Sequence, residues 1–418
     1  MIDNKISRYE SSLKKAMFWL VSYIIWYYLI SYTTFENSVI RQILSGLLCL
    51  AFIKIGALNR FRGSNINSIW YPYVIYTILG CFLTYSFNIM FFWIISLIIL
   101  HLSICPTIHN SIPYKYIVIC GLIFFMGQMF QWLYPSIYFV TIAPFFNTYE
   151  QISSWHSHTG YCGFTYQLGY TGGILLIAEG AAVSLLIRTK TKYGKRILLI
   201  SLILLVVGVF LTGKRTYSVL SLLLPALTYF FQTRNASRKS LILIVVTSFL
   251  SIGYFFLLNN YEMVSDIKGL NRISESIQGV KDNEDISNNR GELANVAWRV
   301  FEAHPILGVG PGQYQEISGE YTTVHNSYLQ ILCEQGIIGI ILFVLPLVVT
   351  LFETITYSKK QKRISPTLFF CLYIQLFYIF YSFTGNTNSN LWGFVTYFIS
   401  ISMLGSYRTY LLIKNCRL

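Results

Sequence analysis

The chain has 418 residues, of which 54% are hydrophobic and only 11% are charged. Soluble domains carry about 25% charged residues, so the composition excludes a soluble enzyme and a disordered protein. The eight cysteines include no CxxC pair, which leaves neither a disulfide scaffold nor a zinc site supported. The net charge of +14 is therefore informative through its placement between apolar segments. Together these features predict a polytopic membrane protein.

Segments that approach the length needed to cross a bilayer, about 20 residues, recur along the whole chain. Twelve are expected, at 16–32, 39–55, 69–86, 89–105, 116–133, 168–187, 197–212, 217–231, 241–258, 327–351, 367–383 and 391–407. No small-residue cleavage site follows the first, which therefore indicates a retained helix rather than a signal peptide. The expected fold is a single integral membrane domain over residues 1–418, all-α, with about 12 transmembrane helices.

The basic residues orient these helices. Twelve crossings place both termini on one side, and that side holds 23 of the 31 Lys and Arg residues, so it is predicted to be cytoplasmic. The outer side retains Arg41, Lys214, Arg215, Lys268, Arg272, Lys281, Arg290 and Arg299. A long loop escapes the orientation rule, which explains residues such as Arg272. It does not explain Lys214 and Arg215, which lie in a turn of a few residues.

Two external loops are expected. Residues 134–167 form an aromatic loop that contains Trp155, His156 and His158. Residues 259–326 form a large external loop between the ninth and tenth helices, which carries the catalytic motif described below.

Within the large loop, residues 291–302 have apolar side chains at a spacing of three to four, which predicts a helix. We expect it to lie on the outer membrane surface with its apolar face down. Arg290 stands at its start, where a cation opposes the helix dipole. An anion bound there by Arg290 and the free backbone N–H groups would explain this placement.

Several motifs surround this helix. His304-Pro305 leads into the glycine-rich stretch 307–312, and His325-Asn-Ser-Tyr-Leu and Glu334-Gln-Gly-Ile-Ile-Gly follow. An earlier turn reads Thr-Gly-Lys-Arg-Thr at 212–216. With the late external loop, these motifs resemble the O-antigen ligase and polymerase superfamily, which comprises integral-membrane glycosyltransferases of the GT-C class.

The resemblance implies transfer of a glycan from undecaprenyl pyrophosphate to a sugar hydroxyl at the outer membrane face, with neither metal nor cofactor. The essential arginines and histidine of the family match Arg215, Arg290 and His325. A guanidinium suits phosphate oxygens, and an imidazole can accept a proton near neutral pH. Alternatively, the arginines contact lipid headgroups or loop carboxylates. His325 would then be a polar residue that precedes a helix capped by Asn326 or Ser327.

Further substrate-binding candidates are weaker. They are Lys214 beside Arg215, Gly310 and Gly312, whose backbone can approach a sugar or phosphate, and Asn326. Many family members have an arginine in the earlier external loop, where this chain has His156 and His158 instead. Glu179 and Glu334 fall within expected helices, and for both a structural role is slightly favoured.

Three functions remain open. The favoured one is an O-antigen polymerase that joins repeat units, because the aromatic loop without an arginine indicates a branch adapted to one repeat unit. A ligase would transfer the glycan to lipid A core. A flippase for the lipid-linked glycan leaves Arg290 and His325 unexplained. The expected partners are glycan donor and acceptor, membrane lipid and a chain-length regulator, but no nucleic acid; the expected location is the bacterial inner membrane, with the active site facing the periplasm.

Overall fold

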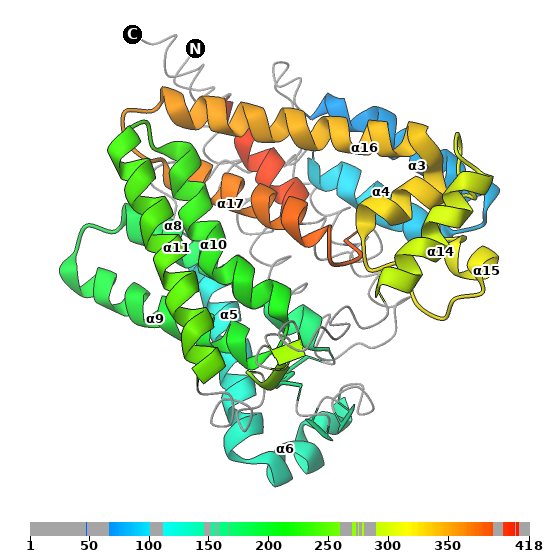
Figure 1. The fold of residues 1–418 in the computed structure, drawn as a ribbon. Helices are drawn as coiled ribbons and strands as arrows, with labels where there is room; N and C mark the ends of the chain where they lie inside the picture. Colours follow the sequence, from blue (N-terminus) through cyan, green and yellow to red (C-terminus); the bar gives the residue numbers. More distant parts are fainter. Residues whose placement is uncertain are drawn as a thin grey trace.

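The helical prediction is confirmed over the part of the chain that the computed structural model describes. That part comprises residues 47, 67–100, 112–145, 152–153, 155–156, 159–165, 167–259, 270–272, 275, 278–279, 290–387, 396–405 and 407–408. Every regular element within these ranges is a helix (Figure 1). The predicted helices at 16–32 and 39–55 lie outside the described residues.

The helices follow one another in chain order with short connections. They are η2 (Ser68–Trp70), α3 (Tyr71–Leu83), α4 (Phe87–Leu100), α5 (Ile112–Leu133), α6 (Pro135–Thr141), η3 (Ala143–Phe145), α8 (Leu168–Arg188), α9 (Lys192–Leu211), α10 (Arg215–Gln232), α11 (Ala236–Asn259), α14 (Arg290–Ala303), α15 (Tyr314–Ser318), α16 (Ser327–Lys360) and α17 (Pro366–Tyr381). An apolar helix follows at Thr396–Gly405.

The apolar helices make this an integral membrane protein. Within the described residues, four are long and apolar enough to cross a bilayer: Pro113–Leu133, Leu168–Arg188, Lys192–Leu211 and Ser327–Lys360. Others, such as Pro366–Tyr381, are apolar but shorter. The total of twelve crossings and their orientation stay predictions. The boundaries shift where polar residues extend a helix, since α16 runs nine residues beyond the expected end at 351.

Helix α8 forms the centre of the core. It is buried along most of its length because small residues let neighbouring helices approach it closely. Gly172 lies against the ring of Tyr217 in α10, and Gly180 against the ring of Tyr373 in α17. Glu179, between these two glycines, is only 1% exposed, in agreement with a structural role for this carboxyl group.

The long helix α16 is broken at Gly336, where the backbone has φ 65° and ψ −166°. The break leaves helical N–H and C=O groups without their usual partners, and the glycine-rich stretch 305–310 supplies new ones. Val309 donates its N–H to Cys333 O at 3.1 Å, and Ile337 donates to Pro305 O at 2.9 Å. The break and the glycine-rich stretch therefore fit together as one unit, which the sequence motifs did not reveal.

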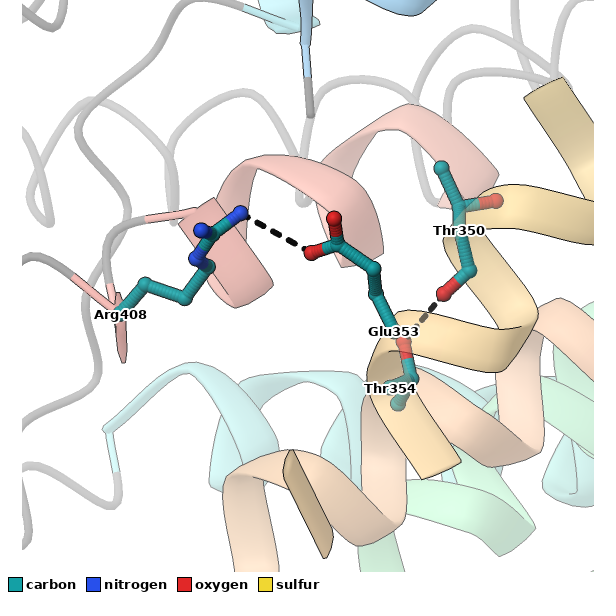
Figure 2. Close-up of polar contacts among 4 residues, drawn as sticks. All are labelled: Thr350, Glu353, Thr354 and Arg408. Carbon is teal, nitrogen blue, oxygen red and sulfur yellow. Dashed lines mark hydrogen bonds and ion pairs between the residues drawn. The ribbon is translucent and has the colours of Figure 1, made fainter. Parts of the chain in front are cut away.

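At the other end of α16, an ion pair ties in the last described helical segment. Arg408 Nη1 lies 2.9 Å from Glu353 Oε2 (Figure 2). The Arg408 guanidinium also lies 5.2 Å from the ring centroid of Tyr357. One turn earlier, Thr354 donates its hydroxyl to Thr350 O at 2.8 Å, also drawn in Figure 2. These contacts fix the end of α16 that is remote from the break.

Candidate functional site

Cationic side chains from three separate segments converge where α10, α14 and α16 begin. Burial lowers the pKa of His325, and the charges of Arg290 and Lys214 lower it further. At the first residue of α10, before the expected membrane segment 217–231, burial and then Arg272 and Arg290 lower the pKa of Arg215. These mutual effects require the five side chains to lie within electrostatic range of one another. The structure thus brings together the three residues that the resemblance selects.

The turn before α10 places Lys214 and Arg215. Helix α9 ends at Leu211, Gly213 adopts φ 63°, and the Lys214 N–H donates to the hydroxyl of Thr212 at 3.3 Å. The earlier external loop braces this turn, because Tyr161 donates its N–H to Leu211 O at 2.9 Å. The two cations are therefore presented from a turn that is held from both sides.

His325 has a left-handed backbone conformation with φ 56°, which costs a residue with a side chain about 1–3 kcal/mol. Asn326, and not His325, caps α16, since its Oδ1 accepts the N–H groups of Tyr328 and Leu329, each at 3.1 Å. Ser327 is bound in turn to Gly385 O at 2.7 Å. The cap and the Ser327 contact hold the half-buried His325 at the cationic cluster. The capping role of Asn326 leaves its predicted substrate contact untested.

Arg290 is the exposed first residue of α14, as the prediction of a helix at 291–302 expected. The inner face of this helix does not lie on the membrane. Ala297 packs instead against Tyr314, Val324 and Cys333 in a small core of its own. The expected membrane-surface position is wrong because α15 and the start of α16 cover the apolar face.

Aromatic rings lie beside the cations. Tyr381, at the end of α17, is within electrostatic range of Arg290. Its ring stacks on that of Tyr217, two residues after Arg215, with centroids 4.9 Å apart. The stacked pair fixes the end of α17 against the first turn of α10.

Gly310 and Gly312 contact protein in the described structure. Gly310 donates its N–H to Glu334 O at 2.7 Å. A side chain at Gly312, where φ is 78°, would approach Ser86 Oγ to 2.9 Å, and Ser86 donates its hydroxyl to Pro311 O at 2.7 Å. The glycines thus dock the loop on the α3–α4 turn. Their contact with a sugar or phosphate stays a prediction.

Glu334 has a structural environment. Its buried carboxyl group accepts a hydrogen bond from Gln330 Nε2 at 3.1 Å and others from the N–H groups of Gly312 and Tyr314. It therefore holds the end of the glycine-rich stretch onto α16. The two motifs that surround Gly310 and Glu334 are two halves of one contact.

The histidines of the earlier loop are less closely tied to the cluster. His156 is exposed, next to Trp155, whose ring packs 5.9 Å from that of Tyr161. His156 is not among the groups that shift the pKa of His325 or Arg215. His158 lies outside the described residues.

Arg272 is the residue that the sequence analysis missed. Burial lowers its pKa first, Glu275 raises it and Arg290 lowers it. In the sequence, Arg272 counted as one of three basic residues that the length of the loop explained. The available signal was its position on the outer side of the chain, in the same loop as Arg290.

The donor set of the cluster is cationic. Among the residues that the structure describes, no group of three or more His, Cys, Asp or Glu side chains could hold a metal ion. Hard divalent cations prefer anionic and carbonyl oxygen ligands. Arg215, Arg272 and Arg290 offer none, and they suit a phosphate group instead.

Comparison with known proteins supports the resemblance. Residues 200–344 match the family model described as O-antigen ligase. This segment contains Arg215, Arg290 and His325. No curated protein shows a significant match to the chain. Over residues 200–344 the chain therefore carries a domain of the O-antigen ligase and polymerase superfamily, whose members transfer lipid-linked glycans.

Proposed function

We propose that the protein is a metal-independent, inverting glycosyltransferase that polymerises undecaprenyl-pyrophosphate-linked repeat units on the outer face of the bacterial cytoplasmic membrane. The observation that carries the proposal is the convergence of Arg215 and Arg290 with His325. Both chain termini are proposed to be cytoplasmic. Residues 259–326 then present the site to the outside.

In the proposed reaction, His325 Nε2 or Nδ1 accepts the proton of an acceptor hydroxyl. The hydroxyl oxygen forms a new bond to the anomeric carbon of the donor glycan. The bond from that carbon to the pyrophosphate oxygen breaks, and its electron pair leaves with the pyrophosphate. A lowered pKa keeps His325 neutral at pH 7, as a general base requires.

The arginines act on the leaving group. Arg215 and Arg290 present fixed cationic donors to the pyrophosphate, on which negative charge grows as the bond breaks. Lys214 adds a cation on the His325 side. Arg272 supplies a third guanidinium, in place of the loop arginine that many family members have. These groups supply the charge compensation that a metal ion provides elsewhere.

Ligase activity is the second candidate. The description of the matching family, O-antigen ligase, favours it, and donor and mechanism would be the same. The acceptor would then be lipid A core instead of another repeat unit. Lipid-linked glycans and membrane lipid are the proposed partners in both cases. A chain-length regulator remains an expectation from the resemblance alone.

Purified protein in detergent with EDTA and the lipid-linked repeat unit tests the proposal. We expect a ladder of oligomers on a gel that is lost in Arg290→Ala and His325→Ala. Arg234→Ala, an exposed arginine at the start of α11, is the control and should retain the ladder. Product only after addition of lipid A core would establish the ligase, and restoration of activity by added magnesium would contradict metal independence.

A further inference from the structure

A surface pocket lies on α14 and α15, next to the glycine-rich stretch. Its volume is about 450 Å³, and Figure 1 shows the two helices side by side at one end of α16. Its apolar floor includes Val300, Val309 and Ile317, and its polar rim includes Arg299, His304 and Glu320. None of these residues takes part in the proposed chemistry.

The lining matches the chemistry of a sugar. A guanidinium donates hydrogen bonds, a carboxylate accepts them, and an imidazole does either, so the rim complements hydroxyl groups that donate and accept. The apolar floor suits the C–H face of a sugar ring, as in pockets that combine apolar walls with few polar groups. A phosphate would be repelled by Glu320, and a lipid chain would leave the charged rim unsolvated.

The pocket is connected to the cationic cluster through rigid elements. Arg290 and Arg299 belong to the same helix, α14, and nine residues of helix rise about 14 Å. Val309 is fixed to α16 by its hydrogen bond to Cys333 O at 3.1 Å. A glycan whose pyrophosphate lies at Arg290 can therefore extend along α14 into the pocket.

We propose that this pocket is a saccharide subsite, in which Arg299, His304 and Glu320 bind a sugar of the lipid-linked glycan at a distance from the reacting bond. The inference rests on the proposed function, because it takes the pyrophosphate to lie at Arg290. It adds the place where the sequence of the glycan is recognised.

Binding measurements with two lipids test the subsite. The probes are undecaprenyl pyrophosphate and the same lipid carrying a complete repeat unit, titrated against the detergent-solubilised full chain by thermophoresis. Arg299→Ala and Glu320→Gln should each weaken binding of the repeat-unit lipid by about tenfold, the effect of one lost hydrogen bond to a charged group. Binding of the sugar-free lipid should not change. Glu316→Gln, an exposed carboxylate in α15 outside the pocket lining, should leave both affinities unchanged.

Two results would overturn the subsite. One is equal affinity of the pocket variants and the control for both lipids, and the other is an equal loss of affinity for both lipids. Unchanged thermal unfolding of the variants separates a binding defect from misfolding. Failure of the proposed function is distinguishable: wild-type protein that binds the repeat-unit lipid better than the bare lipid, without transferring it, would retain the subsite and refute the transferase.

Discussion

The backbone N–H of Gly310 bonds to the carbonyl oxygen of Glu334 at 2.7 Å, across the break in α16. This contact joins the glycine-rich stretch to the helix that His325 precedes. The loop that carries Arg290 is therefore anchored to α16 by backbone groups. The geometry of the cationic cluster depends on that anchor, which leads to the first prediction.

Gly336→Ala should destabilise the protein by about 1–3 kcal/mol, because the backbone at φ 65° and ψ −166° is accessible almost only to glycine. A Cβ atom there would also overlap Ile306 O. A lower midpoint of thermal unfolding, with a parallel loss of transferase activity, would be measured. Gly253→Ala is the matched control, since a Cβ at Gly253 meets no atom within 4 Å. An equal effect of both substitutions would contradict the role of the break.

The rate should rise with pH through the pKa of His325, because only the neutral imidazole accepts a proton. Burial, Arg290 and Lys214 lower this pKa, so the midpoint should lie below the usual value of about 6.5. Lys214→Gln removes one of these cations and should shift the midpoint to higher pH. Initial rates across the pH range provide the measurement. A midpoint that stays in place in Lys214→Gln would separate Lys214 from His325.

Arg272→Ala should weaken binding of undecaprenyl pyrophosphate by about tenfold, as expected when a charged hydrogen bond is lost. Arg272→Lys should recover part of the affinity, because it keeps the charge but not the planar fork. Glu275→Gln, which removes a carboxylate near Arg272 and Arg215, should leave the affinity undiminished or increase it. Equal losses in all three variants would indicate a structural role for the segment.

Asn326→Ala should cost about 1 kcal/mol, the usual effect of losing an N-cap. Asn326→Asp retains an oxygen for the N–H groups of Tyr328 and Leu329 and should retain stability. Thermal unfolding and the Michaelis constant for the lipid donor are to be compared in both variants. A raised Michaelis constant in a fully stable Asn326→Asp would show that the amide also contacts substrate.

The ion pair between Arg408 and Glu353 should contribute no more than about 1 kcal/mol, since the side chains are 22% and 34% exposed and solvent screens partly exposed pairs. A double-mutant cycle with Arg408→Gln and Glu353→Gln measures the coupling. Transfer activity should persist, because the pair lies at the end of α16 remote from His325. Loss of activity in either single variant would connect that end to the site.

Hydropathy and charge determined the class of the protein from the sequence. Long apolar segments such as 168–187 need no tertiary information to be identified as helices, because a bilayer requires each segment to satisfy its own backbone hydrogen bonds. The motif residues Arg215, Arg290 and His325 were likewise found from local patterns. Each pattern is complete within a few residues of chain.

Tertiary structure decided which residues meet. Gly310 bonds to Glu334 only because α16 breaks at Gly336, and no local pattern distinguishes a glycine that breaks a helix from one that packs in it. The apolar face of α14 selected a core of α15 and α16 over the membrane surface for the same reason. Arg272 joined the cluster through contacts between residues far apart in the chain. Such contacts depend on packing free energies that are shared among several segments, and a linear reading of one segment does not contain them.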